Sequence, residues 1–254
     1  MTYAHRLCEK DSLDFSDLFA YQYLVSPCKK PIDGFDPLPF GKFLVHVGKK
    51  LRRAVVTDVK GRFFGYVLGI GVDKTGVIQG VWQLDCLDLD DPRVFDKFAE
   101  YLEDVSGRYV FVCAAGIEQR IYTDSVAMIG AVYNPLTKRV GSALNLVLDD
   151  DPVLHPSYDH SANEKRGGKY TLFHTRDAIA RRINGSFYLD LYNMLETRFW
   201  PRTEQFEVPR EQYGAVYDEI AATARHSIAS ITKMFKTSLP LSGGRDSRLI
   251  VGFA

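Results

Sequence analysis

The sequence has 254 residues, with 32 basic and 32 acidic side chains and a formal net charge of zero. This length fits one large domain or two ordinary ones. A hydrophobic content of 46% is enough for a sizeable core and excludes a wholly disordered chain. The balanced charge lacks the electrostatic footprint of a dedicated binder of nucleic acids or anionic membranes.

Neither a membrane span nor a secretory signal is expected. The longest apolar run, residues 109–117, is shorter than the roughly 20 residues that cross a bilayer. The N-terminus soon becomes charged and lacks the apolar stretch of a signal peptide. We therefore expect a soluble, cytoplasmic protein, whose scattered cysteines are reduced and bind no metal (Cys8, Cys28, Cys86 and Cys113).

Segments rich in β-branched and aromatic residues predict strands from residue 43 to about residue 148. One helix is expected to interrupt them between Asp91 and Gly107, because apolar residues recur there every three to four positions. A strand-rich body with few helices indicates the α+β class, with antiparallel sheets and helices on the outside. The expected strands are 43–47, 54–57, 63–70, 77–84, 109–112, 121–123 and 129–133, before a turn toward 140–143.

Two further segments have sequence patterns that predict a structure. Residues 148–169 are polar and turn-prone, so we expect a surface excursion. His155, Asp159 and His160 lie there without a helix or strand to fix them, which favours a solvated loop over a metal site. Residues 209–235 have helical periodicity and predict a long amphipathic helix whose apolar stripe packs into the core.

The strongest chemical signal lies near the C-terminus. A short apolar strand at 239–241 is expected to enter a glycine-rich turn, and 249–251 suggests the start of a buried helix. The two glycines of the turn let backbone N–H groups approach phosphate oxygens, and the helix presents its positive end to the same place. Two serine hydroxyls add donors, and the aspartate can bind Mg²⁺ or hold the shape of the loop. The turn reads Ser242-Gly243-Gly244-Arg245-Asp246-Ser247.

This turn is not the common P-loop, because it has no G-K-[ST] sequence. A plain polar connection between a strand and a helix is the alternative interpretation. The turn resembles the pyrophosphate-binding S-G-G-x-D-S loop of the N-type ATP pyrophosphatases, and the chain as a whole looks like the asparagine synthetase family. Segments similar to the core strands of that family's glutaminase-like domain, and to the connection that follows it, are 107–111, 121–124, 130–133, 140–143, 170–173, 187–191 and 198–201.

The resemblance covers roughly residues 43–254 and implies an architecture. Residues 1–205 would form a glutaminase-like domain, a four-layer αββα sandwich of the N-terminal-nucleophile type. Residues 206–254 would form the truncated beginning of an α/β nucleotide-binding domain. In the family, ATP activates a carboxylate as an acyl-adenylate and ammonia then attacks it. Carried over to this sequence, the residues that would bind the pyrophosphate part of ATP, with Mg²⁺ implied, are Ser242, Gly243, Gly244, Asp246 and Ser247. Leu241 would lie beside the nucleotide, and Arg245 belongs to the same ATP-binding segment.

Some residues depart from the family pattern. Arg245 and Arg248 replace residues that are usually apolar or small, and they either stabilise a developing pyrophosphate or face solvent. The family's N-terminal cysteine nucleophile is missing. Thr2, exposed if Met1 is removed, is a weak candidate nucleophile, and Cys8 or Cys28 is weaker because neither has a free α-amine. The motifs R-G-P-D and N-G-E-I-Y-N are also missing, so the front domain is interpreted as a degenerate, inactive glutaminase.

Three functions remain open at this point. The first is an ATP-dependent amide ligase of the asparagine synthetase type that joins ammonia or an amine to a small-molecule or peptide carboxylate. The second is a ligase of a specialised branch that acts on a peptide, a lactam precursor or a surface sugar. The third is a non-catalytic remnant or partner subunit with an exposed hydrophobic patch. A homodimer is compatible with all three.

Overall fold

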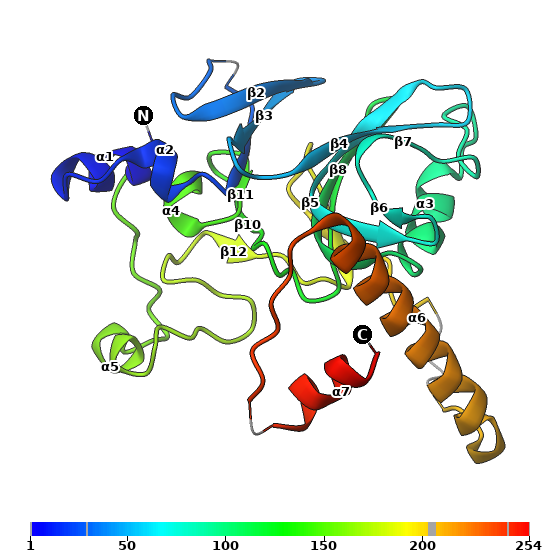
Figure 1. The fold of residues 1–254 in the computed structure, drawn as a ribbon. Coiled ribbons are helices and arrows are strands. Elements are labelled where there is room, and N and C mark those ends of the chain that lie inside the picture. The colour runs from blue at the N-terminus through cyan, green and yellow to red at the C-terminus, as the bar shows by residue number, and fades with distance from the viewer. Residues whose placement is uncertain (1, 29, 203–206, 243, 254) are drawn as a thin grey trace.

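The computed structural model describes residues 2–28, 30–202, 207–242 and 244–253, and it has the mixed α+β composition that the sequence predicts. Within these residues the strands form two sheets of six and eight strands. Among the described strand pairs only β4 with β7 is parallel, which agrees with the expected antiparallel character (Figure 1). The domain boundary expected at 205/206 falls outside the described residues.

The six-stranded sheet has the order β12-β10-β11-β1-β3-β2. Its centre is β1, which pairs with β11 on one side and with β3 on the other. All four residues of β1 and all six of β3 are buried. The strands are β1 Tyr23–Ser26, β2 Phe35–Phe40, β3 Phe43–Gly48, β10 Val132–Asn134, β11 Arg139–Gly141 and β12 Arg181–Arg182.

The eight-stranded sheet has the order β14-β13-β9-β8-β5-β4-β7, and β6 pairs with β5 beside this path. Its two long central strands, β5 and β8, pair in a continuous antiparallel register from Gly65↔Cys113 to Val72↔Ser106. The strands are β4 Arg53–Thr57, β5 Phe63–Asp73, β6 Gly76–Val77, β7 Gly80–Gln83, β8 Ser106–Ala115, β9 Glu118–Thr123, β13 Phe187–Asp190 and β14 Glu196–Arg198.

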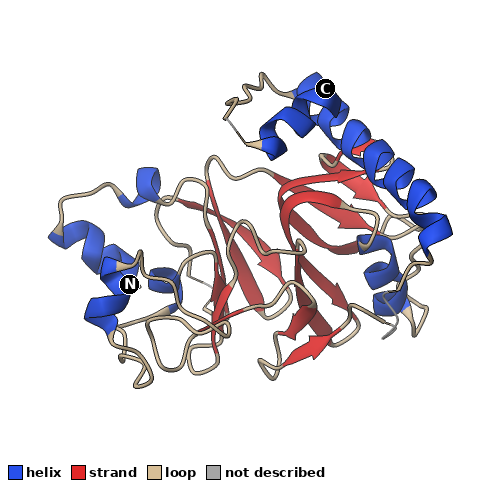
Figure 2. Cartoon of the chain, turned by 90° about the horizontal axis from the view of Figure 1, so that it is seen from below, coloured by secondary structure: helices blue, strands red, loops and turns tan. Residues whose placement is uncertain are grey.

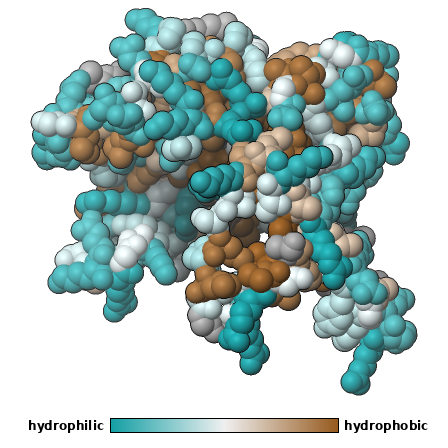
Figure 3. Space-filling model, viewed as in Figure 1, coloured by the Kyte–Doolittle hydropathy of each residue, from teal (hydrophilic) through white to brown (hydrophobic). Residues whose placement is uncertain are grey.

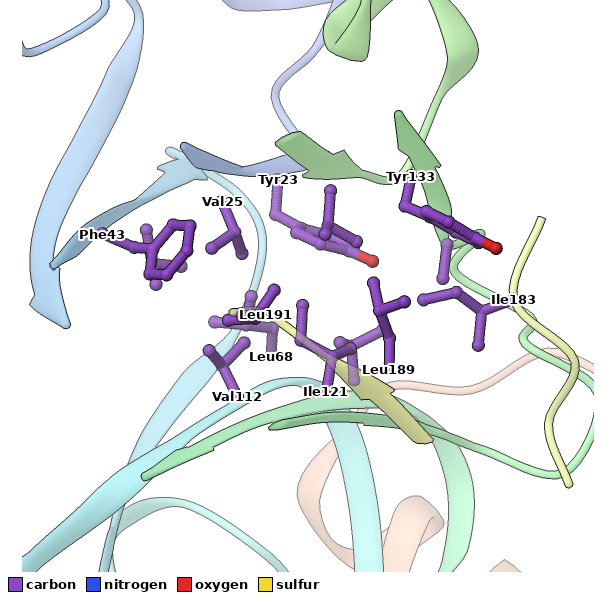
Figure 4. Close-up of a cluster of buried hydrophobic side chains, with 14 of the residues drawn as sticks. Tyr23, Val25, Phe43, Leu68, Val112, Ile121, Tyr133, Ile183, Leu189 and Leu191 are labelled. Carbon is purple, nitrogen blue, oxygen red and sulfur yellow. The ribbon is translucent and has the colours of Figure 1, made fainter. Parts of the chain in front are cut away.

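The two sheets share one apolar core. Side chains from β1 and β3 of the first sheet meet side chains from β5, β8, β9 and β13 of the second, and Figure 4 shows them converging. Alternate residues of each strand point into this cluster, as the two-residue period of a strand requires. Its fully buried members include Tyr23, Val45, Leu68, Val112, Ile121 and Leu189.

A second core lies between the eight-stranded sheet and α3 (Val94–Leu102). The stripe that predicts this helix supplies its buried face, with Phe98 against rings of the sheet. A third core packs α1 (Tyr3–Lys10) and α4 (Leu144–Val147) near β1 and β2. Figure 2 shows the two sheets side by side in the middle, with helices toward both ends of the molecule.

The remaining helices are α2 (Phe15–Leu18), α5 (His160–Lys165), α6 (Tyr213–Met234), which follows the short turn of helix Arg210–Gln212, and α7 (Arg245–Phe253). The long helix expected over 209–235 is therefore confirmed as helical structure. None of the helices in the described part of the chain has the length and apolar character needed to cross a bilayer.

Three expectations about the elements are wrong. The single strand expected at 77–84 is two short strands, β6 and β7. The 148–169 excursion contains a helix, α5, which Asp159 caps by accepting a hydrogen bond from Ala162 N–H. Residues 239–241 are extended coil and pair with no strand in the described structure.

Candidate functional site

The candidate phosphate loop lies where α7 begins. The Ser242 Oγ accepts a hydrogen bond from Gly244 N–H at 3.2 Å and lies 3.1 Å from Ser247 Oγ. Ser242 N–H also donates to Ser247 Oγ at 3.3 Å. These contacts bring the first and last residues of the motif together and place both hydroxyls at the N-terminal end of the helix. Gly243 lies outside the described residues.

The loop is open to solvent. Ser242, Gly244, Arg245 and Asp246 are exposed, and Ser247 is half-buried. Asp246 lies in the first turn of α7, where a carboxylate is stabilised by the helix dipole and is accessible to a cation. The arrangement can present N–H groups, two hydroxyls and one carboxylate to a phosphate with its metal ion.

The apolar residues around the loop are exposed, which contradicts the expected buried helix. Leu241 has 68% of its surface exposed and Leu249 has 59%. Ile250 and Val251 of α7 are also exposed. Figure 3 shows apolar side chains gathered around the position that α7 occupies in Figure 1. Arg245 is exposed and Arg248 donates from Nε to the Gly244 carbonyl oxygen at 3.3 Å, so Arg248 closes the loop.

Helix α6 connects the loop to the sheets through its C-terminal half. Ser227 Oγ lies 2.7 Å from Ser106 Oγ of β8, and His226 Nε2 lies 2.7 Å from the Asp73 carbonyl oxygen at the end of β5. The guanidinium of Arg52 lies 4.4 Å from the centroid of the Phe235 ring. Among the described residues of α6 none is buried. The expectation that its whole stripe packs into the core is therefore wrong.

The structure places Thr2 away from the phosphate loop. Thr2 precedes α1, is 97% buried and lies with its Oγ1 2.8 Å from His5 Nδ1. His5 stacks on Phe15 at 3.8 Å between ring centroids. Thr2 lines neither of the two cavities described below, and its role as a nucleophile stays a prediction.

A cavity of about 380 Å³ lies beside Ser106, the residue of β8 that contacts Ser227 of α6. Its walls are the end of α3, the start of β8, the end of β9 and two later segments, 185–186 and 199–200. Gly185 allows the first of these segments to approach, because a Cβ there would lie 2.2 Å from the Ser125 carbonyl oxygen. No sequence pattern indicated this cavity, although Thr123 is the last residue of a predicted strand and Asp124 follows it directly.

A second hollow, of about 560 Å³, lies between α3, β9 and β13. Its central group is the Arg120 guanidinium, which lies 4.1 Å from the Phe95 ring centroid and 4.2 Å from that of Tyr188. Arg120 Nη2 also contacts Glu118 at 2.5 Å. Two aromatic rings and one carboxylate therefore occupy the guanidinium of Arg120. These contacts connect α3 to the sheet.

The histidines of the 148–169 excursion are engaged with neighbouring groups. His160 Nδ1 lies 3.0 Å from Tyr170 Oη, and its Nε2 lies 2.9 Å from the His155 carbonyl oxygen. His155 stacks on His174 with ring centroids 4.3 Å apart. Within the described parts of the chain no group of three or more His, Cys, Asp or Glu residues is arranged to hold a metal ion.

Comparisons with family models and with curated proteins give no match for this chain. The function of this chain is therefore inferred from the residues of the loop and from the fold that carries them.

Proposed function

We propose that this chain belongs to an ATP-dependent amide ligase of the asparagine synthetase type and that residues 241–247 bind the pyrophosphate part of ATP. The observation that carries the proposal is the S-G-G-x-D-S sequence at the start of α7, with the Ser242 and Ser247 hydroxyls 3.1 Å apart. A helix N-terminus with adjacent hydroxyl donors favours a bound anion.

The chemistry follows from the donors and the acid of the loop. In the complex that we propose, the N–H of Gly244 and the two hydroxyls exchange their present contacts within the loop for hydrogen bonds to the phosphate oxygens, and Asp246 would contribute a carboxylate oxygen to Mg²⁺. Magnesium neutralises phosphate charge when it is bound. A substrate carboxylate oxygen attacks the α-phosphorus, the bond to the bridging oxygen breaks and pyrophosphate leaves. Ammonia or an amine then attacks the acyl carbon, AMP leaves, and the nitrogen loses a proton.

The fold supports the same proposal for the front part of the chain. Two sheets that share one core, with α3 outside one sheet and α1 and α4 near the other, are compatible with a four-layer αββα sandwich of the N-terminal-nucleophile type. In this proposal the front domain is a degenerate glutaminase, because the sequence lacks the N-terminal cysteine and the glutamine-binding motifs of the family. The nitrogen is then supplied as ammonia or as the amine of a second substrate.

Calorimetric titration of the 254-residue chain with MgATP and with magnesium pyrophosphate tests the loop. We expect both to bind, and we expect the double substitution Ser242→Ala and Ser247→Ala to weaken binding at least about tenfold, because two donors are lost. Ser238→Ala is the matched control, since Ser238 is exposed in the same segment but outside the motif. Equal affinity of the double variant and the wild type, or no binding to the wild type, would refute the assignment.

Asp246→Asn tests the metal separately. It keeps the shape of the side chain and removes the charge, so we expect the Mg²⁺ dependence of ATP binding to be lost while the fold is unchanged. Isotope exchange between pyrophosphate and ATP, measured with candidate carboxylates such as aspartate, then reports adenylation. Unchanged exchange in the Asp246→Asn variant would contradict the role of this carboxylate.

A second function, that of a non-catalytic partner subunit, is favoured by one observation. Apolar residues of α6 and α7 are exposed together, among them Tyr217 at 67% and Ile220 at 57%. An apolar surface of this kind indicates a contact with another protein surface. This function predicts no ATP binding, so the titration described above distinguishes it from the ligase.

A further inference from the structure

Residues 165–182, here called the basic segment, carry a local excess of positive charge. The segment contains six lysine and arginine residues and one acidic residue, Asp177. All six basic residues are exposed. The zero net charge of the whole chain conceals this excess, because acidic residues elsewhere in the sequence balance it. The six residues are Lys165, Arg166, Lys169, Arg176, Arg181 and Arg182.

The acidic groups near the basic segment leave most of this charge uncompensated. Asp177 is buried, and its carboxylate accepts hydrogen bonds from three backbone N–H groups. Asp159 caps the start of α5. Glu164 forms an ion pair with Arg176 at 3.0 Å. Arg176 is the only one of the six basic residues that has an ion-pair partner among the described residues. The other five basic side chains are therefore available to an anionic surface.

Hydrogen bonds connect the basic segment with α5. His160 Nδ1 of α5 lies 3.0 Å from Tyr170 Oη. Arg182 Nη2 donates to the Tyr170 carbonyl oxygen at 2.6 Å, and Arg182 N–H donates to the Phe173 carbonyl oxygen at 2.8 Å. These contacts join α5, the middle of the segment and its C-terminal end into one unit. Figure 1 shows α5 at the margin of the molecule, apart from the two sheets.

Two apolar side chains are exposed in the middle of the basic segment. Leu172 has 75% of its surface exposed and Phe173 has 42%. Both residues have a positive φ, 51° and 59°, which residues other than glycine rarely adopt and which costs free energy. The fold maintains this turn, since Tyr158 Oη donates to the Thr171 carbonyl oxygen at 3.2 Å. An exposed apolar pair in a conformation that the fold maintains at a cost indicates contact with another surface.

An anionic lipid bilayer has the two properties that complement this surface. Its headgroups attract lysine and arginine, and the layer below them takes up exposed apolar side chains. A nucleic acid complements the charge but has no apolar layer for Leu172. We propose that the basic segment docks this protein on an anionic bilayer, with its basic side chains at the headgroups and with Leu172 and Phe173 inserted below them. Such docking requires no spanning helix. It is independent of the ligase assignment, because no residue of the phosphate loop takes part.

Flotation of the 254-residue chain with lipid vesicles tests the proposal. One kind of vesicle contains phosphatidylcholine alone, and the other contains about 30% phosphatidylserine. At about 50 mM salt we expect at least about tenfold tighter binding to the anionic vesicles, and at about 300 mM salt most of this difference should be lost because salt screens exposed charges. No binding to the anionic vesicles, or equal binding to both kinds, would overturn the proposal. Displacement from the vesicles by a DNA duplex of about 20 base pairs at equal phosphate concentration would assign the surface to nucleic acid instead.

One pair of variants measures the contribution of charge. Lys165→Gln together with Arg166→Gln should weaken binding to the anionic vesicles at least about tenfold, because two cations near the headgroups are lost. Lys49→Gln together with Lys50→Gln is the matched control, since these lysines are also adjacent and exposed but follow β3. The control should bind as the wild type does.

A second pair measures the contribution of the apolar side chains. Leu172→Ser together with Phe173→Ser should weaken binding about tenfold at low salt and leave its salt dependence unchanged, because apolar insertion is not screened. Ile117→Ser is the control, since Ile117 is 95% exposed in the turn between β8 and β9. Circular dichroism should show the wild-type fold in every variant, because all the substituted residues are exposed. Full affinity in both variants of the basic segment, or an equal loss in the controls, would overturn the proposal.

Discussion

His46 should make the stability of this protein sensitive to mildly acidic pH. The residue lies in β3, has none of its surface exposed, and neither ring nitrogen has a hydrogen-bond partner among the described residues. Burial disfavours the charged imidazolium, and the nearby positive charge of Arg139 adds to the effect. Together they lower the pKa of His46 from 6.5 to about 4.

The sign and size of the effect follow from proton linkage. Between pH 6.5 and pH 4 the unfolded chain binds a proton at this position and the folded chain does not, so acidification favours unfolding. The contribution of neutral His46 to the free energy of unfolding is fully present above its pKa of 6.5 in the unfolded chain. This contribution is lost as the pH falls toward its pKa of about 4 in the folded chain. A shift of this size corresponds to about 3 kcal/mol in total, of which about 2 kcal/mol is lost between pH 7.5 and pH 5.

Urea denaturation followed by circular dichroism at pH 7.5 and pH 5 measures this loss. His46→Leu removes the titrating group and fills a similar volume, so we expect its free energy of unfolding to fall about 2 kcal/mol less than that of the wild type over this range. The pKa of His5 and that of His174 are also lowered by burial, but both residues are unchanged in this comparison.

Leu24→Met is the matched control. Leu24 lies directly opposite His46 on β1 and is fully buried, so its replacement perturbs the same packing without changing a titrating group. Its effect on the free energy of unfolding should be the same at both pH values. If His46→Leu and the wild type lose equal stability on acidification, the reasoning about a neutral, unpartnered imidazole is refuted.

Three further predictions concern packing and charge. Phe98→Ala should lower the free energy of unfolding by about 3–5 kcal/mol in urea, because the ring is fully buried among other rings; a loss below about 1 kcal/mol would contradict this packing. Burial alone would raise the pKa of Asp58, but hydrogen bonds from Arg62 and from backbone N–H groups outweigh it and lower the pKa to about 2. Asp58→Asn should therefore cost about 2–3 kcal/mol at pH 7, and the difference from the wild type should shrink toward pH 2; a constant difference would argue against the charge. Ser227→Ala removes the contact with Ser106 and should speed amide hydrogen exchange in α6 about fivefold, the equivalent of about 1 kcal/mol; unchanged exchange would mean that other contacts hold the helix.

Local patterns predicted the elements whose signal is contained in their own residues. Helix α3 was predicted from one stripe of apolar residues, and the long strands β5 and β8 were predicted from runs of β-branched and aromatic residues. The S-G-G-x-D-S turn was likewise visible, and its helix α7 forms. In each case the period or the motif is complete within about a dozen residues.

Features that depend on distant partners were missed. Strand β1 is only four residues long and becomes central because β3 and β11 pair with it from far along the chain. Residues 239–241 have a strand-like composition but form no strand, since no described strand pairs with them. The cavity beside α3 combines residues from four separate segments of the chain, and no local pattern encodes their meeting.

The sequence by itself determined the α+β class, the long helices and the S-G-G-x-D-S motif that makes residues 242–247 a candidate phosphate loop. The tertiary structure alone decided which strands lie in the centre of a sheet, that the apolar face of α7 is exposed, and that Thr123, Asp124 and Trp200 line one cavity. The physical reason is that helical periodicity and turn chemistry are satisfied by neighbours in the chain. Strand pairing, burial and cavities depend on which distant segments the fold brings together.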